Sequence, residues 1–589
     1  MGMKGVKDKK LIGIMVDNIY TDFSKEIIHG VVTAIPADQD IQLVVLAGEY
    51  NSAPEKNSNL HLYKQVFNSI YQLGAMGDLD GLIISLGSLG TIARQEKALL
   101  CERISGQYSD IPKVYIASDF EGCITVNYDN EMGIREAVDY LVNVNGCSRL
   151  GMLGGREDNV DARLRRQLYE KCLKDDGIIF EENAYEKTDM SENSQEAAER
   201  LLDRNPDVQA IFCVNDSVAK GLYEVMAKRG LVPGKDIMVF GFDNTRLSGE
   251  LIPSLTSIGS DEETLGQKAL ELVLRQLANE KVVSALLPTR VYGRESFAYQ
   301  SYEYTTMEML KADEAFIYRM FDDCFYRYRA ESIDREKIDL RRLFYEFMSR
   351  MLKGMQRHYL SMEEFQEIGR LIDIFFENGG MNYTDAQKLL KSIDRLHGGI
   401  NFVQRSVYSS VLINQLFLRM EDRAICALSD QKNRERRAYT NSLEKLKKFM
   451  ILGTDYSGEN EKSFDRVIRN LDKLGLRNAA FYMYDEPVDF RNGDEATFPE
   501  KIKLRCVMKA GELYLMQKER QDGFVRMIFR REELPVKCKG FVAFSVFYGT
   551  LVYGILLCEL TPDIYDRGSF IADQLGRMIY LNDERVQRR

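Results

Sequence analysis

Two patterns of hydrophobic and polar positions alternate along the first 300 residues. Short apolar runs rich in valine and isoleucine are typical of buried strands, and the segments between them repeat apolar residues with helical spacing. Strands that alternate with helices in this way predict βαβ units and a parallel, helix-covered sheet. The predicted strands are 11–16, 41–48, 81–87, 113–118, 149–155, 210–215 and 236–242, and the clearest helices are 23–34, 132–144 and 162–175.

The pattern changes near residue 300. From Thr306 to about Met450 the chain is charged and helical, and one set of apolar residues recurs at spacings of four and seven. Such spacing predicts a seam for a partner helix. The residues of this seam are Val403, Val407, Val411, Leu418 and Ile425.

Strand-like runs return after Gly453. The stretch from Gly540 to Cys558 contains no charged residue and approaches the length of a membrane span. However, Gly549 and Thr550 divide it into two halves of strand length that are rich in Phe, Val and Tyr, so a buried β-hairpin is expected.

Composition and charge exclude several classes of protein. The 589 residues carry 79 Lys and Arg against 90 Asp and Glu, a net charge of −11, which argues against a chain that wraps nucleic acid or lies on an anionic membrane. The ten cysteines occur singly, as expected for reduced thiols in the cytoplasm. The N-terminus shows no secretory signal, because Asp17 interrupts its apolar run. With only four scattered histidines, we expect no enzyme activity, no metal and no cofactor.

An ordered series of motifs spans residues 10–300. It includes DGLIIS (80–85), VNYDNEMG (126–133), RLGMLGG (149–155) and the stretch from AIFCVND (210–216) to FGFDN (240–244). The series resembles the ligand-sensing core of the lactose/galactose-repressor family. The resemblance implies a two-lobed, type I periplasmic-binding-protein-like α/β fold that encloses a small polar ligand such as a sugar. The family's N-terminal helix-turn-helix is expected to be missing, because the first core strand already begins near Leu11.

The same resemblance implies the ligand-binding residues. Arg165 and Asp243 are expected to anchor opposite sides of the ligand, because a guanidinium donates and a carboxylate accepts hydrogen bonds from hydroxyl groups. Phe212 is expected to stack on the ligand ring, and Arg163 and Arg166 to be solvated neighbours of Arg165. Further candidates follow predicted strands, where ligands bind in open α/β sheets; these are Tyr20, Asp22, Phe23, Asn159, Asp161 and Asn215.

The last part of the chain resembles a GAF domain. The resemblance rests on FDRVIRNLDKLGLRNAAFYMYDEP (464–487) and on the segment from Glu532 to Leu560. Such domains commonly precede an output module. The sequence NGDEATF (492–498) echoes the active-site loop of diguanylate cyclases, but its GAF-like surroundings indicate a loop. The basic run from Gln431 to Lys448, with seven basic and two acidic residues, is interpreted as a solvated helix face rather than a DNA contact.

Together these features predict three units: a two-lobed ligand-sensing domain (10–300), a helical connector (305–450) and an α+β GAF-like domain (453–585). We expect a cytoplasmic, homodimeric signalling protein that relays ligand-induced closure to a GAF-like domain and a downstream output. Two alternatives stay open: a transcription regulator that binds DNA through an unrecognised element, and the sensory part of a diguanylate cyclase or histidine kinase that lacks its output domain.

Overall fold

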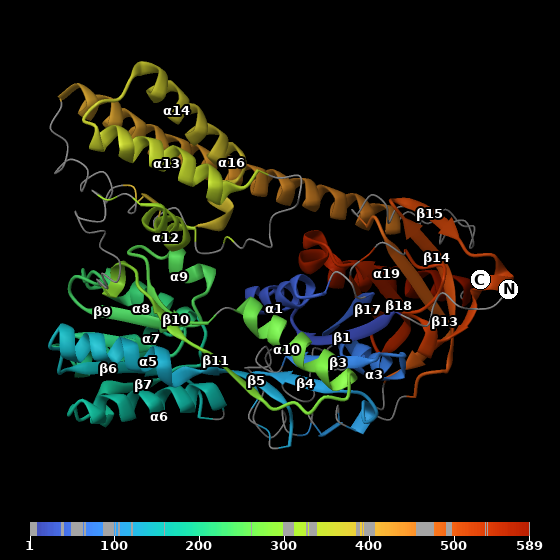
Figure 1. Cartoon of the computed structure of the whole chain (residues 1–589). Coiled ribbons are helices and arrows are strands. Elements are labelled where there is room, and N and C mark those ends of the chain that lie inside the picture. Colours follow the sequence, from blue (N-terminus) through green and yellow to red (C-terminus); the bar gives the residue numbers. More distant parts are fainter. Residues whose placement is uncertain are drawn as a thin grey trace.

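The computed structural model describes residues 9–36, 40–48, 66–85, 106–118, 122–157, 159–260, 262–297, 313–325, 338–384, 407–454, 476–490, 497–535 and 540–587, with a few shorter stretches between these ranges. Its strands form two sheets, and a helical bundle lies beside them (Figure 1). The first 300 residues make two lobes, each with its own sheet.

Lobe 1 is built on parallel strands in the order β11-β5-β4-β3-β1-β2. Its three described long helices are α1 (Asp22–Thr33), α3 (Ser69–Met76) and α10 (Glu262–Leu277). The side chain of Thr21 caps α1 by accepting a hydrogen bond from the amide of Ser24. The strands are β1 (Lys10–Asp17), β2 (Ile41–Gly48), β3 (Gly81–Ser85), β4 (Lys113–Ile116), β5 (Thr125–Asp129) and β11 (Ala285–Pro288).

Lobe 2 has the strand order β12-β10-β9-β8-β6-β7, and only β12 runs antiparallel to its neighbour. Its apolar core is separate from that of lobe 1. The strands are β6 (Leu150–Gly154), β7 (Tyr185–Lys187), β8 (Ala210–Cys213), β9 (Met238–Phe242), β10 (Thr256–Gly259) and β12 (Arg290–Tyr292). The long helices are α5 (Asn130–Asp139), α6 (Val160–Asp175), α7 (Gln195–Arg204) and α8 (Asp216–Lys228).

All seven strands predicted for this region are present, with ends shifted by up to two residues. The prediction missed five strands: β5, β7, β10, β11 and β12. They are short, between three and five residues, so they show no clear alternation of polar and apolar positions.

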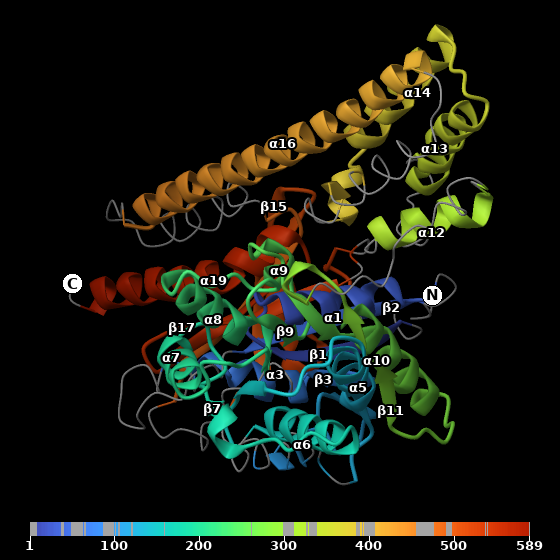
Figure 2. The same cartoon turned by 90° about the vertical axis from the view of Figure 1, so that its left-hand side faces the viewer.

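A helical bundle with its own aromatic-rich core follows the two lobes. It contains α12 (Glu314–Cys324), α13 (Leu340–Gln356), α14 (Met362–Glu377) and the N-terminal part of α16 (Val407–Thr454). Helix α16 has 48 residues and continues beyond the bundle (Figure 2). Near its other end, Phe449 is buried in the core that contains lobe 1 and the last part of the chain.

The C-terminal unit consists of an antiparallel sheet and a long helix. Its strands are β13 (Ala479–Asp489), β14 (Lys501–Lys509), β15 (Glu512–Leu515), β16 (Asp522–Phe524), β17 (Gly540–Tyr548) and β18 (Leu551–Glu559), and the helix is α19 (Pro562–Gln587). The expected hairpin at 540–558 is confirmed: β17 and β18 pair antiparallel around Gly549, whose φ of 60° suits a tight turn. Among the described residues, no helix is long and apolar enough to cross a membrane.

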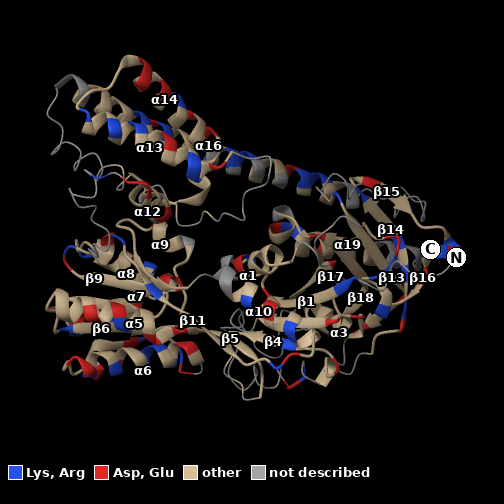
Figure 3. Cartoon of the chain, in the orientation of Figure 1, with Lys and Arg blue, Asp and Glu red and all other residues tan. Residues whose placement is uncertain are grey.

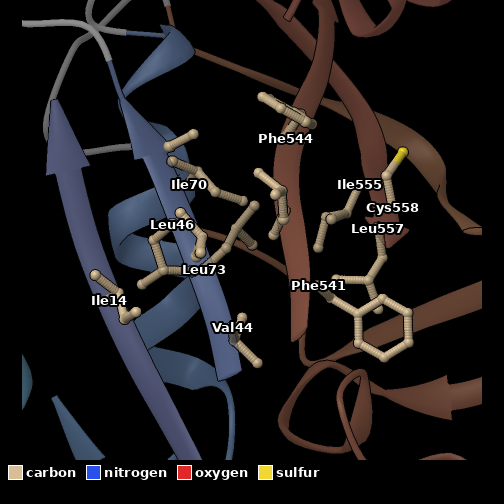
Figure 4. Close-up of a cluster of buried hydrophobic side chains, with 14 of the residues drawn as sticks. Ile14, Val44, Leu46, Ile70, Leu73, Phe541, Phe544, Ile555, Leu557 and Cys558 are labelled. Atoms are coloured by element: carbon tan, nitrogen blue, oxygen red, sulfur yellow. The ribbon is translucent and has the colours of Figure 1, made fainter. Parts of the chain in front are cut away.

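Lobe 1 and the C-terminal unit share one sheet, which the sequence did not predict. Residues 43–46 of β2 pair in parallel with residues 540–543 of β17, so a 12-stranded sheet runs from β11 to β15. Side chains from both sides meet in one apolar core, among them Leu46, Leu73 and Phe541 (Figure 4). We call lobe 1 together with the C-terminal unit the common body.

Polar contacts reinforce this junction. The guanidinium of Arg530, on the C-terminal side, binds the carboxylates of Asp78 and Asp80 at 2.8 and 2.9 Å. The hydroxyl groups of Ser69 and Ser545 lie 2.8 Å apart in a buried position. The edge strand β17 of the C-terminal unit therefore continues the sheet of lobe 1.

Candidate functional site

The carboxyl ends of the strands in each lobe face the other lobe. Within the described residues, the chain crosses between the lobes three times: from β5 to α5, from β10 to α10 and from β11 to β12. Strand β5 runs parallel to β4, β3 and β1, and β10 runs parallel to β9, β8 and β6. Because β5 and β10 each leave their lobe at the carboxyl end, the loops after the neighbouring strands point toward the opposite lobe. Open α/β sheets bind ligands at such strand ends.

Arg165 lies at the centre of the lobe-2 strand ends. It is buried on α6 and donates hydrogen bonds to the carboxylate of Asp243 and to the carbonyl oxygen of Val214, both at 2.8 Å. A longer contact of 3.4 Å joins its Nε to the side chain of Asn130, which follows β5. The guanidinium carbon lies 3.6 Å from the centre of the Phe242 ring, a cation–π arrangement. Arg165 therefore ties three elements of the site together.

The loop after β9 holds Asp243 in an unusual backbone conformation. Asp243 has φ 93° and Asn244 φ 47°, values that residues other than glycine adopt only when their surroundings fix them. The amide of Asn244 donates to the hydroxyl of Ser257 at 3.0 Å, and that of Asp243 donates to the carbonyl of Ile258 at 2.8 Å. Because the side chain of Asp243 is still 35% exposed, its carboxylate is accessible while its backbone is fixed.

The buried carboxylate of Asp216 also holds this loop in place. It accepts hydrogen bonds from the amide and the hydroxyl of Thr245, at 2.7 and 2.9 Å, and from the hydroxyl of Ser257 at 2.6 Å. Burial raises the pKa of Asp216 to about 7, although these hydrogen bonds favour the ionised form and oppose the shift. Gly241 makes room for it, because a Cβ at that position would lie 2.4 Å from the carboxylate.

Lobe 1 contributes buried polar side chains at its own strand ends. Asp17 ends β1, Asn18 follows it, and Ser85 ends β3; all three are nearly inaccessible. The side-chain oxygen of Asn18 accepts no hydrogen bond from the residues that the structure describes, and its backbone has φ 61°. The sequence analysis missed these residues. The available signal was the polar pair Asp17 and Asn18, which directly follows the predicted strand 11–16.

Two expectations about the central residues are corrected. Arg165 and Asp243 both belong to lobe 2 and form an ion pair, so they do not hold opposite sides of a ligand. Phe212 is fully buried in the core of lobe 2, where its ring stacks on Phe240 with centres 4.7 Å apart and contacts Tyr169. No face of the Phe212 ring is open to a ligand, and we leave it out of the candidate site.

Two further candidates cap helices. The side chain of Asn159 accepts from the amide of Ala162 at the start of α6, and that of Asn215 accepts from the amide of Val218 at the start of α8. Asn215 also donates to the carbonyl of Met190 at 3.0 Å. Both residues position the strand-end loops of lobe 2.

The remaining candidates lie just before α1 or in the first turns of α1 and α6. Asp161 is half-buried in the first turn of α6. In lobe 1, Tyr20 is exposed and Phe23 packs partly against the core, while the side chain of Asp22 lies outside the described residues. The structure tests none of these four as ligand contacts.

The arginines beside Arg165 differ from each other. Arg166 is not a solvated neighbour: it binds Glu170 at 2.6 Å and Glu182 at 2.8 Å and stacks on Tyr185. These two glutamates raise the pKa of Arg166, which keeps it charged. Arg163 is half-buried, and its side chain makes no ion pair or hydrogen bond with the residues that the structure describes, so it is the better control for Arg165. The described residues contain no group of His, Cys, Asp and Glu that could hold a metal ion.

Comparison with known proteins agrees with this geometry. The family model of the periplasmic binding protein-like domain matches residues 138–297, which include Arg165 and the Asp243 loop. The repressor CytR of Escherichia coli is 26% identical over 281 residues, which cover 47% of this chain and 75% of CytR. Residues 138–297 thus match a periplasmic binding protein-like domain, and about half of the chain is similar to the repressor CytR.

Two further relatives are regulators as well. Catabolite control protein A of Priestia megaterium is 26% identical over 306 residues, or 50% of this chain and 84% of that protein. The regulator CelR of Thermobifida fusca is 30% identical over 174 residues, or 29% of this chain and 51% of CelR. Among solved structures, a CelR–cellobiose complex aligns with 49% of this chain at 22% identity and a TM-score of 0.41. The relatives of this domain are transcriptional regulators rather than enzymes.

Proposed function

We propose that this chain is a ligand-responsive regulatory protein that binds a small polar molecule of the sugar class between lobe 1 and lobe 2. The observation that carries the proposal is the fixed, accessible carboxylate of Asp243, which Arg165 and Asp216 hold at the strand ends of lobe 2. A carboxylate in this position accepts hydrogen bonds from two neighbouring hydroxyl groups of a sugar. The relatives, which are regulators, support the same class of function.

The two lobes would supply different parts of the binding energy. In lobe 2, Asp243 accepts hydrogen bonds from the ligand, and Arg165 orients that carboxylate. In lobe 1, Asn18 has a buried acceptor that a ligand hydroxyl would satisfy. Ligand bound to both sides would therefore stabilise the closed arrangement of the lobes.

The connections of the chain support a relay from this site. The chain leaves lobe 2 after Phe297, which is buried in the lobe-2 core, and it forms the helical bundle next. It then returns through α16 to the common body. A rotation of lobe 2 against the common body would therefore act on both ends of the helical segment. Near the exit, Arg294 binds the side chain of Asn244, the neighbour of Asp243, at 2.7 Å.

The finer parts of the proposal concern the end of this relay. We infer that the C-terminal unit is GAF-like, which its antiparallel sheet and long final helix support. We also place the protein in the cytoplasm, where the nine cysteines that the structure describes, all free thiols, would stay reduced. The signal would pass from the C-terminal unit to an output domain or protein.

A thermal-shift screen of sugars and nucleosides with the full chain tests the proposal. A ligand at a hundred times its dissociation constant adds about 2.7 kcal/mol to the stability of the state that binds it, enough for a clear rise in Tm. We expect at least one sugar or nucleoside to raise Tm in the parent protein and not in Asp243→Ala. A library in which no compound raises Tm, or one whose best compound stabilises both proteins equally, contradicts the proposal.

A further inference from the structure

Helix α16 has one face that the protein covers and one that it leaves open. Its buried residues pack into the bundle near one end and into the common body near the other. At about 100° per residue, these residues share one side of the helix. They are Leu412, Ile413, Leu416, Phe417, Met420, Ala424 and Phe449.

The other side of α16 carries exposed apolar residues along its whole length. Six of them fall within roughly 80° of arc on a straight helix, and each is between 40% and 66% exposed. They are Val411, Leu418, Ile425, Tyr439, Leu443 and Met450. We call them the α16 stripe. It includes the three predicted seam residues whose side chains are described; Val403 lies outside the described residues, and so does the side chain of Val407.

The middle of α16 is exposed on the faces whose side chains the structure describes. Every residue from 429 to 445 whose side chain the structure describes is exposed. A helical segment without tertiary packing is only marginally stable in water, because helix propensity alone does not offset the cost of ordering the backbone. An apolar stripe with heptad spacing along such a segment is the pattern by which one helix packs on another.

The charges of α16 are segregated along its length. Arg419 and Arg423 both form ion pairs with one carboxylate, Asp373 of α14. The other charged residues of the first half are acidic: Glu421, Asp422 and Asp430. The second half has seven basic residues against two acidic ones, and Figure 3 shows blue segments of the α16 ribbon between the bundle and the C-terminal unit.

We propose that α16 pairs with α16 of a second copy of this chain in antiparallel orientation. Antiparallel pairing places the acidic half of each helix against the basic half of its partner, whereas parallel pairing would place seven basic residues against seven. One register pairs four residues of the stripe: Val411 meets Met450 and Leu418 meets Leu443 of the partner, with the two-fold axis near Asp430. The inference does not depend on the identity of the ligand.

Sedimentation of the full chain tests the pairing. We expect a species of twice 67.7 kDa at tens of micromolar. The double variant Leu418→Glu, Leu443→Glu should weaken dimerisation about a hundredfold or more, because it places charges in the apolar layers. Ile179→Glu, which changes an apolar residue of lobe 2 that is 88% exposed, should leave dimerisation unchanged. A monomer of about 68 kDa at these concentrations, or a double variant that dimerises like the parent, overturns the proposal.

Cysteine cross-linking tests the orientation. Cys426 is exposed on α16, so it is first replaced by serine. In a mixture of Leu418→Cys and Leu443→Cys chains, the antiparallel pair predicts disulfides between the two kinds of chain, and a parallel pair predicts disulfides between like chains. The parent dimer should also weaken in 1 M salt, where complementary charges are screened, whereas a parallel dimer would strengthen. Cross-links between like chains, or a dimer strengthened by salt, overturns the antiparallel assignment.

A nucleic acid is the competing partner for the basic half of α16. Suppose that a DNA duplex shifts the full chain in a gel, and that the double variant Lys445→Glu, Lys448→Glu abolishes this shift but leaves sedimentation unchanged. The basic half of α16 then binds DNA. That result overturns the proposal. Loss of dimerisation in the same double variant, with no DNA shift in the parent, supports it.

Discussion

Replacing Arg165 by alanine tests how the site is held together, and it requires no ligand. In the structure, the guanidinium of Arg165 bridges Asp243 and the carbonyl of Val214 while it covers the ring of Phe242. Arg165→Ala removes both charge-assisted hydrogen bonds at once. It leaves the carboxylate without its cation and the carbonyl without a donor in the interior of lobe 2.

The expected cost follows from these contacts. Leaving one partner of a buried ion pair alone costs roughly 3–5 kcal/mol. The side chain of Asp243 is 35% exposed, however, so water partly solvates the carboxylate that remains. We therefore expect lobe 2 to lose about 2–4 kcal/mol of stability against local unfolding. The double variant with Asp243→Ala should lose less than the sum of the two single variants, because it also removes the isolated carboxylate.

Amide hydrogen exchange measures this change where it occurs. Lobe 2 has its own core, so exchange of the amides in α6, β8 and β9 reports its opening separately from the common body. A loss of 2–4 kcal/mol corresponds to about thirty- to a thousandfold faster exchange. Arg163→Ala, two residues away on the same helix, is the matched control. If Arg165→Ala exchanges within twofold of Arg163→Ala, the ion pair does not organise lobe 2 and the reasoning is refuted.

Three further predictions concern residues around the site and the junction. Burial raises the pKa of Asp216 to about 7, so the folded protein holds this proton more tightly than the unfolded chain does. The free energy of unfolding of the parent, relative to that of Asp216→Asn, should therefore fall as pH rises from about 4 to 7. A difference that grows with pH contradicts this. Arg530→Ala should destabilise the common body by roughly 1–3 kcal/mol in thermal unfolding, because two carboxylates of lobe 1 lose their partner, and an unchanged Tm contradicts this. Arg294→Ala should leave ligand affinity within about threefold but reduce the ligand-induced change in exchange of α16, and an undiminished change excludes this arginine from the relay.

The sequence predicted the elements of the fold better than their assembly. Seven of the twelve strands of lobes 1 and 2 were visible as apolar runs, because a parallel sheet covered by helices buries both faces of its strands. The pairing of β2 with β17 was not visible, because backbone groups of residues almost 500 positions apart make it. In the structure, all eight residues of β2 are buried, Gln42 among them, as expected for a strand inside a sheet rather than at its edge.

The site was predicted in part, through resemblance to a family. The resemblance indicated Arg165 and Asp243, but their ion pair depends on the strand order β9-β8-β6, which no local pattern encodes. The strand register explains why Phe212 does not stack on a ligand. Phe212 lies directly opposite Phe240 in the neighbouring strand, and paired residues on adjacent strands point to the same face. That face is the core.

A calorimetric titration of Asp243→Ala tests the central claim, that the Asp243 loop is the ligand-binding element of lobe 2. The ligand is the sugar or nucleoside that raises Tm most in the parent. We predict a loss of roughly 2–4 kcal/mol in binding free energy, or about thirty- to a thousandfold in affinity, because ligand hydroxyls lose a charged acceptor. Arg163→Ala should bind within about 0.5 kcal/mol of the parent. If Asp243→Ala binds the ligand as tightly as the parent does, the loop is not the binding element.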